Sequence, residues 1–130
     1  MTIFSKIING EIPSYKIAET ENFYAFLDIS PLQKGHTLVV PKVEVDKIFD
    51  VPDTYLNELM QFAKPIAKAI EASFPCNRVS MVTVGLEVPH AHVHLIPING
   101  ANDINFSNPK LQLTTEDFQQ IQALIVSKLI

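Results

Sequence analysis

The stretch PHAHVHLIP, residues 89–97, restricts the fold more than any other part of this sequence. The proline at each end disfavours a helix through it. In a β-strand, side chains at every second position project from the same face. We therefore predict a strand over residues 90–98, with His90, His92 and His94 together on one face and the apolar side chains between them directed at the core.

The residues on both sides of this stretch predict an antiparallel sheet with separate helices. Short β-rich runs bounded by turn residues predict further strands at residues 14–18, 23–27, 36–40 and 79–84. Apolar side chains at helical spacing predict helices at residues 3–9, 53–74 and 115–129. Because the strands dominate the middle of the chain and the helices lie apart from them, we predict an α+β fold.

Two interruptions add detail to this pattern. Pro65 lies inside the long predicted helix, and we expect it to bend or split that helix because proline lacks a backbone donor. Residues 99–113 are rich in asparagine and lack periodicity, which predicts a loop.

Length and composition indicate one folded domain. The chain has 130 residues, of which 47% are hydrophobic and 18% are charged, so it can bury enough apolar surface to fold. We expect residues 1–130 to form a single domain. The formal net charge of −4 argues against duplex nucleic acid as the main ligand, because such binding depends on neutralising phosphates. A single nucleotide, which needs only a few local donors, is compatible with this charge.

Cysteine content and hydropathy favour a cytoplasmic protein. Cys76 is the single cysteine, which rules out a disulfide framework and a multi-cysteine zinc site. The first residues lack the features of a signal peptide, and no apolar run approaches the ~18 residues of a membrane span. We therefore expect a soluble cytoplasmic protein that does not contact membranes.

Three interpretations of the clustered histidines are open. They could form a solvated polar face, although such faces more often carry lysine, threonine or glutamate. Two of them could share a zinc ion with His36 or Glu87, because the outer pair on a straight strand is separated by ~13 Å and cannot reach one ion. A neutral imidazole could instead attack a phosphorus centre near pH 7, while its neighbours orient it and donate to phosphate oxygens.

The same stretch resembles the signature His-φ-His-φ-His-φ-φ of the HIT (histidine triad) family, where φ is a hydrophobic residue. Other segments are similar to that family in order and rough spacing: IFSKII at residues 3–8 with EIP at 11–13, AFLDISP at 25–31, and GHTLVVPK at 35–42. The resemblance covers nearly the whole chain, and these segments together are far more specific than the triad alone.

The resemblance implies a HIT-like fold and a mechanism. HIT proteins are nucleotide hydrolases and transferases that act at the α-phosphorus of a nucleoside phosphate. By resemblance, His92 is the nucleophile that forms a nucleotidyl-histidine intermediate. His94 would contact phosphate oxygens, while His90 and His36 would belong to the supporting network.

The resemblance also implies a nucleotide pocket. Asp28 matches the acid that hydrogen-bonds the ribose hydroxyls, and the matching apolar base pocket consists of Ile3, Phe4, Phe26 and Ile29. Without the resemblance, the Asp28 side chain before Ser-Pro could equally form a turn, and the two phenylalanines could be ordinary core.

One segment departs from the family pattern. Many members carry Gly-Gln-Ser/Thr-Val before the first histidine, where this chain has GLEV at residues 85–88. Gly85 fits, but Leu86 cannot hydrogen-bond a phosphate chain or leaving group. Glu87 would repel a polyphosphate if ionised, could donate a proton to a departing amine or alkoxide if protonated, or could simply face solvent. We place Gly85 and Glu87 among the substrate-contacting residues, with the choice of leaving group open.

We therefore predict a nucleoside phosphoramidase or nucleotide hydrolase that acts on purine nucleotides through His92 without a cofactor. A dinucleoside polyphosphate hydrolase, a weakly catalytic nucleotide sensor and a metal-dependent hydrolase that uses the histidine face are the alternatives. The family's zinc-binding subset uses Cys-x-x-Cys, and because Ser5 lies in the matching region without a cysteine, no structural zinc is expected. Small HIT proteins are usually homodimers with sheets joined across the interface, and we expect a homodimer here.

Overall fold

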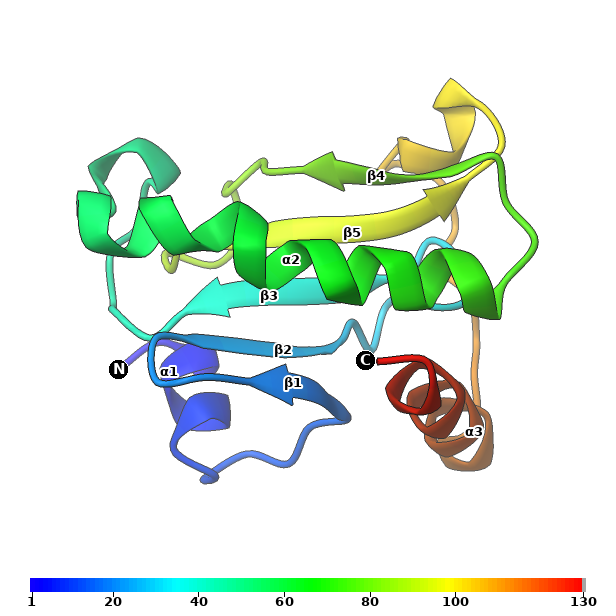
Figure 1. Cartoon of the computed structure of the whole chain (residues 1–130), viewed down its shortest axis with the longest axis horizontal. Helices are drawn as coiled ribbons and strands as arrows, with labels where there is room; N and C mark the ends of the chain where they lie inside the picture. Colours follow the sequence, from blue (N-terminus) through cyan, green and yellow to red (C-terminus); the bar gives the residue numbers. More distant parts are fainter. Residues whose placement is uncertain (130) are drawn as a thin grey trace.

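The fold is built on a five-stranded antiparallel sheet. The computed structural model describes residues 1–129. The strands lie in the order β1-β2-β3-β5-β4, and each neighbouring pair is antiparallel (Figure 1). They are β1 (Lys16–Glu19), β2 (Phe23–Leu27), β3 (Thr37–Pro41), β4 (Arg78–Val82) and β5 (Val93–Ile98). The predicted α+β class with an antiparallel sheet is confirmed.

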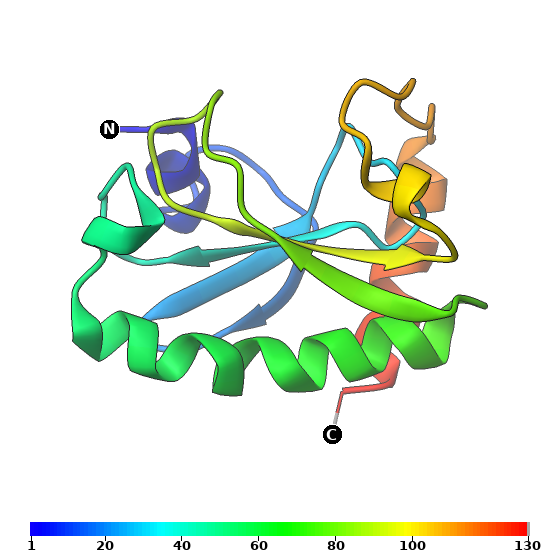
Figure 2. The same ribbon diagram turned by 90° about the horizontal axis from the view of Figure 1, so that it is seen from above.

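Helices cover both faces of this sheet. They are α1 (Ile3–Ile8), the 3₁₀ helix η1 (Ile48–Asp50), α2 (Asp53–Ser73), the 3₁₀ helix η2 (Ala101–Ile104) and α3 (Thr115–Ser127). The long helix α2 runs along one face, and α1 lies on the other face together with the connection between β4 and β5 (Figure 2). Within residues 1–129, no helix combines the length and the apolar character needed to cross a bilayer.

Strand β2 shows how alternating side chains divide the sheet into two faces. Phe23 and Leu27 pack in the core beneath α2 and α3, together with Ile70. Tyr24 and Phe26 project the other way, into a smaller apolar cluster formed with α1. All five residues of β2 are therefore buried, and the functional side chains lie on the second face.

The predicted histidine strand is shorter than expected. Strand β5 begins at Val93, so His94 is the one triad member within the ladder, where it pairs with Leu38 of β3. The pairing with β3 ends at Val93 and the pairing with β4 ends at His94, so the preceding residues have no ladder to join. His90 and His92 therefore lie in an irregular segment before the strand rather than along one straight face.

Two other predictions need correction. Of the two outcomes expected at Pro65, a bend or a split, the split does not occur, since α2 is continuous through it. Pro65 lies on the exposed side of the helix with Gln61, whose carbonyl loses its helical partner but can bind water. Residues 99–113 are not wholly loop, since they contain η2. There the Asp103 carboxylate accepts the backbone N–H of Asn99 across 2.7 Å.

Candidate active site

The four histidines of the chain are all buried. The exposed fraction is 1% for His36 and His90, and 7% for His92 and His94. The interpretation of the triad as a solvated polar face is therefore wrong. Because an unpaired polar group is costly in the interior, the hydrogen bonds of each ring determine where its hydrogen resides.

His36 and His94 form a hydrogen-bonded pair with a defined direction. The backbone N–H of Leu32 donates to Nδ1 of His36 across 3.0 Å, so the hydrogen of the neutral ring lies on Nε2. That Nε2–H donates to Nδ1 of His94 across 2.9 Å. The hydrogen of neutral His94 is consequently on its own Nε2, where it can be donated to a ligand. Burial lowers the pKa of His36 to about 3 and that of His94 to about 4, so both rings are neutral near pH 7.

His92 has the opposite arrangement, with Nε2 unprotonated. Its Nδ1–H donates to the backbone carbonyl of His90 across 2.7 Å, which leaves the lone pair on Nε2. Burial lowers the pKa of His92, while its backbone hydrogen bond and the charge of Glu87 act in the other direction. Phe4 packs edge-on against the ring, with the centroids 4.9 Å apart. A neutral and oriented imidazole of this kind can act as a nucleophile.

His90 uses both of its ring nitrogens within the protein. Nε2–H donates to the carbonyl oxygen of Pro41 across 2.9 Å, and Nδ1 accepts the hydroxyl of Thr2 across 2.8 Å. The same Thr2 hydroxyl accepts the backbone N–H of Ser5 across 3.1 Å and thereby caps α1. His90 is thus fixed by the start of the chain, and its backbone carbonyl in turn holds His92.

Asp28 lies beside the His36 ring, just after β2. One carboxylate oxygen accepts the backbone N–H of Ser30 across 2.8 Å, and the other is 3.5 Å from Nε2 of His36. Burial raises the pKa of Asp28, and the Ser30 hydrogen bond and the charge of Lys110 oppose that shift. The side chain is 19% exposed, so the carboxylate can still accept hydrogen bonds from a ligand. Asp28 therefore forms a local turn and also lies at the site.

The predicted base-pocket residues divide into two pairs. Phe4 and Phe26 are buried and pack edge to face with centroids 5.6 Å apart. Ile3 and Ile29 are 49% and 72% exposed, and they lie outside the buried cluster that contains the phenylalanines. The structure thus brings the Phe4 ring to His90 and His92, with Phe26 packed behind Phe4, and leaves the isoleucines at the surface.

The segment that departs from the family pattern leads directly into the triad. The Thr83 hydroxyl donates to the backbone carbonyl of His92 across 2.8 Å and so ties the end of β4 to this histidine. Gly85 then adopts a φ of +76°, in the left-handed region that favours glycine. Leu86 is 88% exposed and Glu87 is also exposed, so both side chains are free to meet a ligand.

Asp28, His36 and His94 bring three possible metal-ligand atoms within 4.8 Å of one another. The His36 and His94 nitrogens are 2.9 Å apart, whereas two nitrogens on one tetrahedral zinc ion are separated by ~3.4 Å. Leu32 already occupies the other nitrogen of His36. These distances fit a hydrogen-bonded relay and do not fit a metal centre.

Two residues at the site, Phe106 and Lys110, were missed by the sequence-based predictions. The Phe106 ring lies edge-on to His94, with the centroids 4.8 Å apart. The half-buried Lys110 ammonium donates to the carbonyl oxygens of Phe106 and Asn108, across 2.5 Å and 3.0 Å. Both lie in a segment without periodicity, so no sequence signal could have indicated them.

Comparisons with known proteins point to one family. The model of the HIT domain matches residues 9–100. The adenosine 5'-monophosphoramidase HNT1 of Saccharomyces cerevisiae is 45% identical over 96 residues, which cover 73% of this chain but only 61% of the yeast protein. Protein hit of Bacillus subtilis is 35% identical over 135 residues, covering 98% of this chain and 93% of the relative.

A solved structure shares the whole architecture. The crystal structure of a Hit-like protein from Bartonella henselae superposes with a TM-score of 0.84 at 28% identity, covering 98% of this chain and 96% of that one. The domain match spans most of the chain, and it includes the four histidines whose bonds are described above. This chain therefore belongs to the HIT family.

Proposed function

We propose that this chain hydrolyses purine nucleoside phosphoramidates, or related nucleotides, at the α-phosphorus through a nucleotidyl-histidine intermediate on His92. The observation that carries the proposal is the opposite protonation of two neighbouring rings. Nε2 of His92 has a free lone pair, Nε2 of His94 bears a hydrogen, and the ring centroids are 5.0 Å apart. One ring can attack phosphorus while the other donates to a phosphate oxygen. The name of the yeast relative, adenosine 5'-monophosphoramidase, supports the phosphoramidate as substrate.

The proposed reaction has two displacements at phosphorus. In the first, Nε2 of His92 forms a bond to the α-phosphorus as the bond from phosphorus to the amine nitrogen breaks. The amine leaves after taking a proton from solvent or from a protonated Glu87. In the second, water forms a bond to the phosphorus as the bond from phosphorus to Nε2 of His92 breaks, and the water loses a proton to solvent. This step releases the nucleoside monophosphate and leaves His92 neutral again. The Nε2–H of His94 stabilises the phosphate charge in both steps.

The nucleoside would lie between Asp28 and the apolar residues of the site. The partly exposed Asp28 carboxylate would accept the ribose hydroxyls. The exposed Ile3 and Ile29 would contact the base, while the buried Phe4 and Phe26 would support the pocket from beneath.

The leaving group would meet Leu86 and Glu87. An ionised Glu87 would repel the negative charge of a departing polyphosphate, which favours amines over nucleotides as leaving groups. A dinucleoside polyphosphate hydrolase is therefore the second candidate. A weakly catalytic sensor is the third, because Leu86 offers no hydrogen bond to the leaving group.

A single series of reactions tests the proposal. The protein is incubated with adenosine 5'-phosphoramidate in excess EDTA and quenched under alkaline denaturing conditions that preserve a phosphorus–nitrogen bond. We expect full turnover and an adenylyl adduct on the peptide containing His92, detected by mass spectrometry. His92→Ala should lose turnover and adduct, whereas His90→Asn, which keeps the backbone carbonyl, should retain the adduct.

Each other outcome contradicts the proposal in a different way. Full turnover by His92→Ala would exclude the covalent mechanism. Turnover that EDTA abolishes would favour the metal-dependent hydrolase. Binding of AMP with no product after long incubation would favour the sensor.

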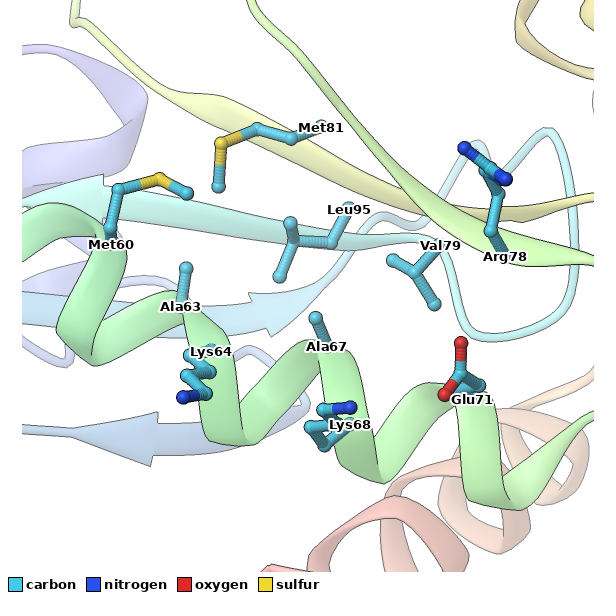
Figure 3. A pocket seen from close by; sticks show the side chains of 10 residues that line it. All are labelled: Met60, Ala63, Lys64, Ala67, Lys68, Glu71, Arg78, Val79, Met81 and Leu95. Carbon is cyan, nitrogen blue, oxygen red and sulfur yellow. The ribbon is translucent and has the colours of Figure 1, made fainter.

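We also propose a homodimer formed along β4 and α2. Strand β4 is an edge of the sheet, where backbone groups are available for pairing. Beside it lies a cavity of about 350 Å³ between α2 and β4, with Met60 and Met81 at one end and Glu71 and Arg78 at the other (Figure 3). Leu95 of β5 lines this cavity, so the cavity is on the opposite face of the sheet from the adjacent His94. Met60 and Met81 are 62% and 41% exposed in the single chain. We expect sedimentation equilibrium to give a dimer and Met81→Lys to give a monomer.

A further inference from the structure

We propose that Phe106 is a positioning residue that holds the His94 ring in the orientation in which its Nε2–H meets the substrate phosphate. The catalytic consequence rests on the proposed function, whereas the effect on His94 itself rests on the packing alone. Phe106 lies beyond residues 9–100, the part of the chain that the HIT domain model matches. The residue that positions His94 would thus lie outside the matched segment.

Ring contacts add to the hydrogen bond that holds the His94 ring. Among residues 1–129, its imidazole has one hydrogen bond, from Nε2–H of His36 to Nδ1, so rotation about the Cβ–Cγ bond is opposed by a hydrogen bond at one ring atom. The His36, His92 and Phe106 rings surround it, with centroid separations of 5.1, 5.0 and 4.8 Å. Phe106 also packs edge-on to His36, at 6.3 Å. Such edge-to-face contacts have a preferred geometry, so Phe106 limits the rotation of the His94 ring.

Hydrogen bonds hold the loop that carries Phe106 in place beside the site. The Lys110 ammonium donates to the Phe106 carbonyl across 2.5 Å, and the Asn108 side chain donates to the carbonyl of Asn102 in η2 across 2.7 Å. The Leu111 N–H donates to the carbonyl of Pro31 across 2.9 Å and so ties the loop to the segment between Asp28 and His36. An aromatic ring on a segment held by hydrogen bonds can position its neighbour, because the ring itself does not move away.

The Phe106 ring also covers part of the His94 side chain, which is buried. Burial is the largest cause of the lowered pKa of His94, at about 4, and the charge of His92 is the second. The other groups that carry charge or titrate around this pair are His36, His90, Asp28, Lys110 and Glu87. All of them remain when Phe106 is shortened, so a change in the His94 titration would report the loss of burial alone.

The test uses the full chain and a matched pair of variants. Phe106→Leu removes the ring at the site, and Phe62→Leu removes a half-buried ring of α2 that stacks on Phe23 at 5.2 Å in the other core. Histidine NMR titration should show the pKa of His94 rising by about one unit in Phe106→Leu and unchanged in Phe62→Leu. The value of kcat with adenosine 5'-phosphoramidate should fall about tenfold in Phe106→Leu, with KM within about twofold. Phe106→Tyr, which keeps the ring, should restore both.

The outcomes separate this inference from the proposed function. If Phe106→Leu is folded and leaves both the His94 titration and kcat unchanged, the positioning role is wrong. An equal shift in Phe62→Leu would indicate general loosening and would also overturn it. If the wild-type chain turns over no nucleotide, the proposed function fails, but the titration still shows whether Phe106 holds His94.

Discussion

His36 donates its Nε2–H to Nδ1 of His94 across 2.9 Å, and this bond fixes the tautomer of His94. The Leu32 N–H sets the direction of this bond, because it donates to Nδ1 of His36 and so leaves the hydrogen of neutral His36 on Nε2. His92 has the opposite tautomer, because its Nδ1–H donates to the backbone carbonyl of His90. Two adjacent neutral imidazoles thus present a hydrogen and a lone pair, and neither needs to be charged.

Removing the donor to His94 should impair the proposed reaction. In His36→Leu, Nδ1 of His94 has no donor, so the ring can place its hydrogen there and leave Nε2 without one. We expect kcat to fall about 10–100-fold, as for other groups that orient a functional histidine. Steady-state kinetics and ¹⁵N NMR of the His94 tautomer check this. His36→Gln, whose amide can donate, should recover part of the activity, and an unchanged tautomer in His36→Leu would contradict the relay.

The hydroxyl of Thr2 should matter for activity as well as for stability. Thr2→Val removes both the cap of α1 and the donor to His90, whereas Thr114→Val removes only the cap of α3. Thr114→Val should lose about 1 kcal/mol of unfolding free energy, and Thr2→Val about 2 kcal/mol or more because it also leaves Nδ1 of the buried His90 unpaired; urea denaturation measures both. Only Thr2→Val should also lower kcat several-fold. An equal loss of kcat in both variants would mean that His90 does not depend on this hydroxyl.

The buried histidines should make the protein less stable as the pH falls. Their ordinary pKa is 6.5, and in the folded chain His36 titrates at about 3 and His94 at about 4. Between pH 6.5 and these values the unfolded chain binds more protons than the native one, so the stability is complete above pH 6.5 and declines below it. We expect a loss of about 4 kcal/mol between pH 7.5 and pH 5. Equal urea midpoints at pH 7.5 and pH 5 would show that the rings are not buried as neutral groups.

Glu87 should influence both the pH dependence and the choice of leaving group. Glu87→Gln should remove one titrating limb from the pH–rate profile if this carboxyl protonates the departing amine. It should also raise the relative kcat/KM for dinucleoside polyphosphates by about two- to fivefold, since one exposed charge is removed. Glu21→Gln, another exposed glutamate, serves as the control. A profile identical to that of the wild type would remove Glu87 from the chemistry.

Features that depend on neighbouring residues were predicted accurately from the sequence, whereas features that depend on contacts between distant parts of the chain were not. Strand β2 was predicted with its observed limits, because its alternating side chains and flanking turn residues are local signals. The start of the histidine strand was wrong by three residues, because a strand ends where its neighbours stop pairing and the sequence of one segment does not contain that information. Hydrophobic periodicity likewise could not predict that all four histidines are buried.

The order of the residues was enough to identify the antiparallel architecture and the histidine motif, since both depend on positions a few residues apart. Which ring carries a hydrogen, and on which nitrogen, depends on partners far away in the chain: Leu32 through His36 for His94, and Thr2 and Pro41 for His90. Phe106 reaches His94 only because the chain returns over the sheet after β5. Tautomers follow from hydrogen-bond partners, and these partners meet only when the chain has folded.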